Sequence, residues 1–111
     1  MKVAFSSTGD GCKENFDIRF GRAQGFFVLD TDNNNTTYIS NESNEAEHGA
    51  GTNAAKTMVD ANVDIIITGQ IGPRAKEALN ASGVKIYSGM GYGTLEEAYD
   101  RYQNGLLELQ N

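Results

Sequence analysis

Glycines gather after three short apolar runs, where they could bring the backbone close to a bound ligand. The runs lead into residues 6–9, 68–72 and 88–94, and the last two continue into predicted helices. The first turn of a helix offers free N–H groups and partial positive charge, which suit a compact anion. Each glycine could instead serve only a tight turn. The predicted ligand-binding residues in these loops are Ser7, Thr8, Gly69, Gln70, Gly89, Met90, Gly91 and Gly93.

Several basic residues fall in or near the same loops. The chain has nine basic and fifteen acidic residues and a net charge of −6, so a local basic cluster would stand out. The planar guanidinium of arginine pairs well with anions that carry several oxygen or sulfur atoms. We therefore add Arg19 and Arg22 to the predicted binding residues. The alternative is that the basic residues pair with nearby carboxylates, namely Glu14, Asp17 and Glu77.

The single cysteine and the single histidine are the candidate metal ligands. Cys12 lies in a loop rich in glycine and serine, and His48 precedes a glycine-rich helix start. Thiolate and imidazole bind soft and borderline metals, and Met90 could add a thioether. Neither residue has the paired spacing of a zinc site, so a half-buried thiol and a solvated imidazole remain the alternatives. One cysteine allows no intrachain disulfide, and we expect a reducing cytoplasm.

Composition and missing motifs exclude several function classes. The acidic balance, with a pI near 4.6, argues against a basic face for nucleic acid or anionic lipid. No apolar run is long enough for a signal peptide or a membrane span. The dinucleotide, P-loop and nucleophile-elbow motifs are absent. A two-metal nuclease needs clustered carboxylates on its strands, and none is present.

The pattern of the chain predicts a mixed α/β fold in one domain over residues 1–111. Short β-branched or aromatic runs predict strands at 2–6, 25–30, 36–40, 63–68 and 84–87. Three- and four-residue spacing predicts helices from about 50 to 62, from 73 to 82 and from 94 to 104. We expect a three-layer arrangement of three helices on a mixed five-stranded sheet, with an antiparallel N-terminal hairpin at its edge.

Several segments in order resemble a known family. They are Asp17–Ala23 (DIRFGRA), Gly49–Gly51, Asp64–Pro73 and Gly83–Tyr87. The chain resembles the dinitrogenase iron–molybdenum cofactor biosynthesis family over nearly its whole length, within a small stand-alone branch. The resemblance implies a ribonuclease H-like fold and non-catalytic binding of an anionic metal–sulfur cluster, iron–sulfur or molybdenum-containing. Nitrogenase carriers of this family have a histidine ligand at the position that Arg19 occupies here.

Two roles remain for the chain at this point. As a cluster carrier, it would work with proteins that donate or accept the cluster. As an interaction or regulatory module without a cluster, it would use an exposed edge such as Tyr38–Ile39, which could pair with a second copy. Neither role involves nucleic acid or a membrane.

Overall fold

The structure is a computed structural model that describes residues 1–9 and 15–111. In these residues six strands form one mixed sheet in the order β3-β2-β1-β4-β5-β6, accompanied by three helices. The strands are β1 (Lys2–Ser7), β2 (Gly25–Asp30), β3 (Thr36–Ser40), β4 (Ile65–Ile67), β5 (Lys85–Ser88) and β6 (Glu108–Leu109). The helices are α1 (Ala50–Asp60), α2 (Pro73–Ala81) and α3 (Leu95–Gln103).

Strand β1 lies inside the sheet and is buried along almost its whole length. It pairs antiparallel with β2 and parallel with β4, and β4 pairs parallel with β5. The hairpin of β2 and β3 has the predicted bounds and forms one edge of the sheet. The carboxyl ends of the three parallel strands therefore lie at the same end of the sheet, as the glycine pattern requires.

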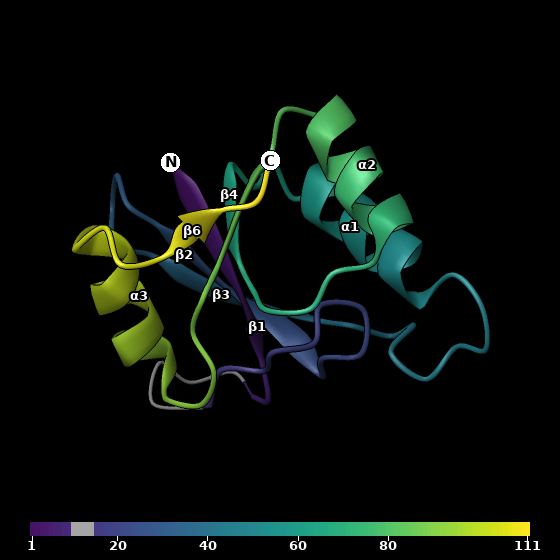
Figure 1. Cartoon of the computed structure of the whole chain (residues 1–111), viewed down its shortest axis with the longest axis horizontal. Coiled ribbons are helices and arrows are strands. Elements are labelled where there is room, and N and C mark those ends of the chain that lie inside the picture. Colours follow the sequence, from purple (N-terminus) through teal and green to yellow (C-terminus); the bar gives the residue numbers. More distant parts are fainter. Residues whose placement is uncertain (10–14) are drawn as a thin grey trace.

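The helices cover the two faces of the sheet unequally. Helices α1 and α2 pack side by side on one face, and α3 lies alone on the other (Figure 1). Helix α2 begins with Pro73 in its first turn, as predicted. Helix α3 begins with the predicted capping box, in which the Thr94 hydroxyl accepts from the Glu97 N–H and the Glu97 carboxylate accepts from the Thr94 N–H.

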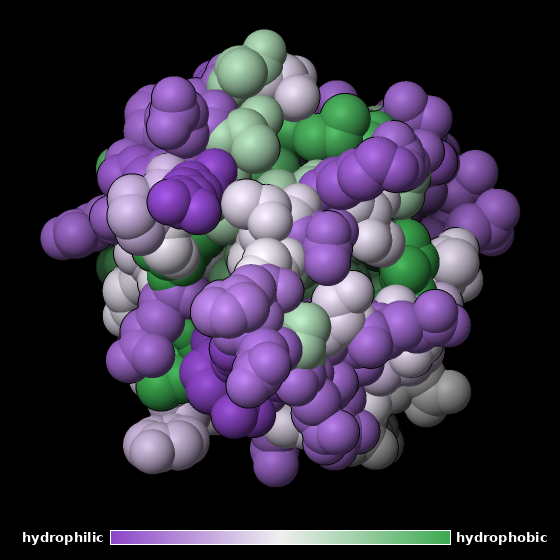
Figure 2. Space-filling model, turned by 90° about the vertical axis from the view of Figure 1, so that its right-hand side faces the viewer, coloured by the Kyte–Doolittle hydropathy of each residue, from purple (hydrophilic) through white to green (hydrophobic). Residues whose placement is uncertain are grey.

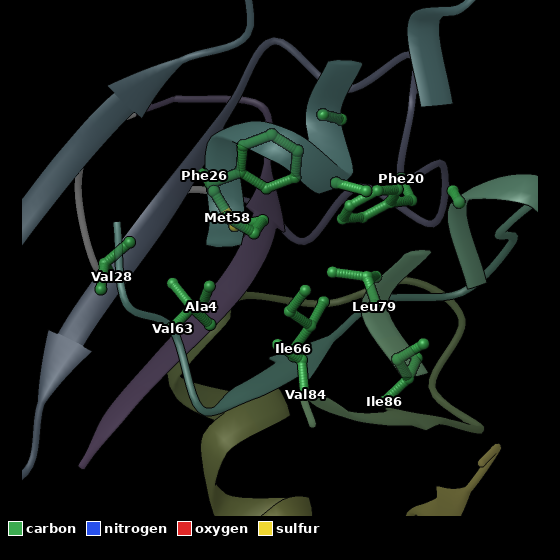
Figure 3. Packing of buried hydrophobic residues seen from close by; sticks show 13 residues of the cluster. Ala4, Phe20, Phe26, Val28, Met58, Val63, Ile66, Leu79, Val84 and Ile86 are labelled. Atoms are coloured by element: carbon green, nitrogen blue, oxygen red, sulfur yellow. The ribbon is translucent and has the colours of Figure 1, made fainter. Parts of the chain in front are cut away.

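Each face of the sheet has its own hydrophobic core. Phe20, Met58 and Leu79 gather between the sheet and the pair of helices, where Figure 3 shows them facing Ile66 of β4. The second core lies under α3 and includes Phe5 and Leu95. The described residues contain no helix that is both long and apolar enough to cross a membrane.

The predicted strand count was wrong by one. Residues 108–109 form β6, which pairs antiparallel with Tyr87 and Ser88 of β5. Its two side chains are exposed and the strand is only two residues long. Such a segment shows no apolar alternation, and only the unpaired edge of β5 makes it a strand.

Candidate functional site

One segment crosses the carboxyl end of the sheet and organises the whole region. We call residues 15–20 the crossing segment. Its Phe16 N–H donates to the carbonyl of Gly93 at 2.8 Å, and its Asp17 N–H donates to the carbonyl of Ser6 at 2.9 Å. The Phe20 N–H donates to the carbonyl of Gln70 at 2.9 Å. The segment thereby ties together the ends of β1 and β4 and the loop after β5.

The crossing segment occupies the glycine-rich end of β4. A Cβ at Gly69 would lie 2.6 Å from the carbonyl oxygen of Ile18, so only glycine permits this approach. The Gln70 N–H donates to the same carbonyl, and Arg19 forms a parallel bridge with Gln70. The predicted binding residues Gly69 and Gln70 therefore use their backbone to hold another part of the chain.

Arg19 forms an ion pair with a buried carboxylate. Its Nε and Nη2 donate to Oδ1 and Oδ2 of Asp17 at 3.1 and 3.0 Å. The side chain of Asp17 is 5% exposed and that of Arg19 is 55% exposed. Hydrogen bonding to Asp17 raises the pKa of Arg19 above its ordinary value, so the guanidinium stays charged. One of the predicted alternatives, pairing with Asp17, is thus realised at Arg19.

Arg22 and His48 lie near the start of α1. Arg22 Nη1 donates to the carbonyls of Asn44 and Ala46 at 3.0 and 2.6 Å, which fixes the loop before the helix. His48 is exposed and directly precedes Gly49, the N-cap residue of α1. Cys12, the other predicted metal ligand, lies outside the described residues. Within the described ranges, no three His, Cys, Asp or Glu side chains are grouped to hold a metal ion.

The remaining predicted residues lie on the β1 and β5 side of the crossing segment. Thr8 is exposed, and its hydroxyl donates to the carbonyl of Asn15 at 3.1 Å. Ser7 is buried, and its hydroxyl bonds with the backbone of Gly9. Gly89 and Gly91 are exposed, whereas Met90 is only 6% exposed and packs in the core under α3.

The described residues line two hollows in this region. The first, which we call the Arg19 pocket, has a volume of about 500 Å³. It is lined by Thr8, Asn15–Arg19, Tyr92 and Gly93. The structure therefore brings together Thr8, Arg19 and Gly93 of the predicted residues in one hollow. Gly69, Gln70 and Arg22 do not line it.

The second hollow lies between the first turns of two helices. This α1–α2 pocket has a volume of about 340 Å³ and is lined by Gly49, Gly51, Thr52 and Gly72–Ala75. Neither N-cap residue, Gly49 or Gly72, has a side chain that caps its helix, and neither first turn contains an acidic residue. The first N–H groups of a helix have no partner within the helix. The pocket thus presents backbone donors and positive helix ends.

Arg74 adds a full positive charge to the α1–α2 pocket. It is exposed in the first turn of α2 and forms no salt bridge with any residue that the structure describes. Figure 2 shows the side of the molecule that carries α1 and α2, and its surface is mostly hydrophilic. The residues that line the α1–α2 pocket include no carboxylate, and the first turns of α1 and α2 contain none either. The charge of Arg74 is therefore not balanced within the pocket.

The residues of the α1–α2 pocket were not predicted as one site, although the sequence carried signals for them. Gly72 ends the predicted 68–72 loop, Gly49–Gly51 and Pro73 mark helix starts, and Arg74 is one of the basic residues near the predicted loops. That both helix starts face one hollow follows from the close contact of the helices, where a Cβ at Gly51 would lie 3.5 Å from the Cβ of Ala75. The absence of acidic residues from both first turns was the sequence feature that could have indicated an anion-binding site.

The fold and these hollows define a mixed α/β protein whose candidate binding surface lies at the carboxyl ends of its parallel strands. The family model described as dinitrogenase iron-molybdenum cofactor matches residues 1–105. The chain belongs to this family. The resemblance of the DIRFGRA segment and the later glycine motifs is thereby confirmed.

Solved structures agree with this assignment. The apo form of the orange protein from Desulfovibrio gigas has a TM-score of 0.92 and 34% identity, over 97% of this chain and 91% of that chain. TM1290 from Thermotoga, of the DUF35 family, has a TM-score of 0.86 and 34% identity with the same coverage. MJ0580, an uncharacterised protein of Methanocaldococcus jannaschii, is 28% identical over 80% of this chain and 77% of its own length.

Proposed function

We propose that this protein binds and carries an anionic metal–sulfur cluster, iron–sulfur or molybdenum-containing, and catalyses no reaction on it. The cluster is the cargo, and proteins that donate or accept it are the partners. Membership of the dinitrogenase iron-molybdenum cofactor family supports the cofactor class. The likeness to the orange protein supports a small domain of this fold as the carrier.

The observation that carries the proposal is the α1–α2 pocket. Two helix N-termini with no capping side chain and no acidic first turn open on one hollow beside Arg74. Backbone N–H groups and helix ends stabilise anions without any covalent ligand. A cluster with several negative charges gains from every one of these donors. The cluster would therefore be held by hydrogen bonds and charge.

One candidate metal ligand lies next to this cradle. His48 is exposed one residue before the pocket residue Gly49. We propose His48 as an accessory ligand there, and we propose Cys12, which lies outside the described residues, as a ligand on its thiolate chemistry alone. Arg22, which fixes the loop before α1, supports the same wall of the pocket. Arg19 and the residues around Gly93 form the competing location for the cluster.

A pair of substitutions at Gly72 tests the pocket. Gly72 has φ −71° and ψ 159°, and a Cβ there would meet no atom within 4 Å. Gly72→Asp and Gly72→Asn both supply a good N-cap, so neither should lower thermal stability. Only the aspartate brings a negative charge to the anion. We expect Gly72→Asp to weaken cluster binding at least about tenfold and Gly72→Asn to have a much smaller effect.

The measurement is metal and acid-labile sulfide content, with a visible spectrum, after anaerobic incubation with iron and sulfide or with tetrathiomolybdate. Arg74→Ala should reduce loading, and Arg101→Ala, in the last turn of α3, is the matched control. Loss of metal in Cys12→Ser or His48→Ala would show a covalent ligand. Loss in Arg19→Ala but not in Arg74→Ala would move the cluster to the competing location.

One outcome would end the carrier proposal. If the wild-type protein stays colourless and free of metal with both reagents, the cluster is not its ligand. The interaction or regulatory module, with an edge such as Tyr38–Ile39, would then take its place. A stable protein partner recovered without metal would support that alternative.

Three finer assignments belong to the same proposal. The ribonuclease H-like classification of the fold follows from the family resemblance. A cytoplasmic location follows from the single cysteine and the reducing environment that it favours. The extent of the domain, residues 1–111, follows from the single run of alternating strands and helices.

A further inference from the structure

The Arg19 pocket shares no lining residue with the α1–α2 pocket and has a different chemistry. Its positive charge comes from Arg19, and the carboxylate of Asp17 lies against that charge. The local net charge of the pair is zero. A cluster with several negative charges therefore gains little electrostatic binding energy in this pocket. A ligand with one charge depends more on hydrogen-bond geometry, so the neutralising carboxylate weakens its binding less.

Asp17 holds the guanidinium in one orientation. The Asp17 backbone is fixed because its N–H donates to the Ser6 carbonyl at 2.9 Å and its carbonyl accepts from the Ser6 hydroxyl at 2.5 Å. Its Oδ1 also accepts from the backbone N–H of Arg19 at 2.9 Å. The buried carboxylate is thus a rigid support, and Arg19 is oriented before any ligand arrives.

A guanidinium can bind two planar anions, one on each of its edges. Asp17 occupies the edge formed by Nε and Nη2. The other edge, formed by Nη1 and Nη2, has a free Nη1, which finds no acceptor in the described residues. Among the described residues, the Arg19 side chain is 55% exposed and lines the pocket.

An aromatic side chain lines the same pocket. Tyr92 is 94% exposed, and it is the most exposed large apolar or aromatic side chain that the structure describes. Gly91 and Gly93 flank it, and Gly93 lines the same pocket together with the partly buried Ile18. A ring and an aliphatic side chain offer contact to a flat or apolar group.

We propose that the Arg19 pocket binds a small organic carboxylate, which is a second site distinct from the cluster site. The carboxylate lies on the Nη1–Nη2 edge of Arg19, opposite Asp17. The flat or apolar body of the ligand lies against Tyr92 and Ile18.

The test is an amide and arginine-side-chain NMR titration of the whole protein with benzoate at constant ionic strength. Benzamide is the neutral probe of the same shape, and inorganic phosphate is the tetrahedral oxyanion. We expect saturable shifts with benzoate at Asn15, Ile18, Gly93 and the Nε of Arg19. Benzamide should give none. This comparison uses the wild-type protein and needs no substitution.

Two variants locate the contacts. Arg19→Lys keeps the charge but loses the second edge, and it should bind benzoate at least tenfold more weakly. Tyr92→Ala should weaken benzoate at least threefold and leave acetate binding unchanged, because acetate has no ring to contact. Arg101→Ala is the control for general charge effects and should bind benzoate as the wild type does.

Each opposing result overturns the proposal. Arg19 does not bind a carboxylate if benzoate gives no saturable shifts or if benzamide gives an equal response. The same conclusion follows if Arg19→Lys binds benzoate as tightly as the wild type. Tighter binding of phosphate than of benzoate would exclude a planar carboxylate as the ligand class. The Gly72→Asp variant should still bind benzoate, so failure of the cluster proposal and failure of this one are distinguishable.

Discussion

Gly21 of the DIRFGRA segment lies directly against Gly51 in the first turn of α1. A Cβ at Gly21 would come within 2.9 Å of both the backbone nitrogen and the Cα of Gly51. Gly21, which directly follows the crossing segment, thus sets how closely the chain can approach α1. This contact joins the family motif to the wall of the α1–α2 pocket.

Gly21→Ala should therefore destabilise the protein. The added methyl group meets backbone atoms that cannot move aside alone, and such overpacking costs about 1–3 kcal/mol. Thermal or urea unfolding monitored by circular dichroism measures the change. Gly91→Ala is the control, because a Cβ there would meet no atom within 4 Å. An unchanged stability in Gly21→Ala would contradict the tight contact.

Asn111 should contribute to stability although it lies at the end of the sequence. Its Oδ1 accepts from the Ile86 N–H at 2.9 Å, and its Nδ2 donates to the Val84 carbonyl at 2.7 Å and to the side chain of Asn80. Asn111→Ala removes these hydrogen bonds from partly buried groups, which costs about 0.5–1.5 kcal/mol. Gln110→Ala keeps the backbone bond from Gln110 to Ile86 and should change little. Equal melting temperatures in the two variants would refute this role.

Acid should weaken α3 through Glu97. Hydrogen bonds from the Thr94 backbone N–H and hydroxyl lower the pKa of Glu97 below its ordinary value of 4.5. A lowered pKa in the folded state stabilises the fold above pH 4.5, and this stabilisation is lost as the pH falls through the folded-state pKa. Glu97→Gln should flatten that part of the curve of melting temperature against pH. Glu96→Gln, which leaves the capping box intact, is the control.

Alkaline pH should lower the stability of the protein through Tyr102, which also lies in α3. Burial, with smaller contributions from Tyr87 and Tyr99, raises the pKa of Tyr102 above its ordinary value of 10.0. The unfolded chain then loses this proton first, so stability is full below pH 10 and falls as the pH rises toward the folded-state pKa. Tyr102→Phe should reduce that alkaline loss of stability. Absorbance titration of the tyrosines would oppose the prediction if all of them ionised together near pH 10.

The sequence alone determined most of the secondary structure. Residues 25–30 and 36–40 form a hairpin with the predicted bounds because β-branched and aromatic residues surround a run of asparagines. Thr94 and Glu97 mark the start of α3 because a capping box is a local device. The family could also be recognised, since its motifs follow one another along the chain.

Tertiary structure decided what the predicted site residues contact. Gly69 and Gln70 looked like parts of a ligand loop, but the crossing segment lies on them through its backbone, which has no sequence signature. The sequence left Arg19 either as an anion-binding cation or as a partner of a nearby carboxylate, and the fold decided for the pair with the buried Asp17. The two-residue strand β6 exists only because β5 offers it an unpaired edge.

The α1–α2 pocket shows the same division most clearly. Each helix start was readable from the sequence, because glycine and proline act locally on the backbone. That the two starts open on one hollow depends on how α1 and α2 pack on the sheet, and this packing is the sum of many long-range apolar contacts. Local chemistry thus determined the donors, and the global fold alone brought them together.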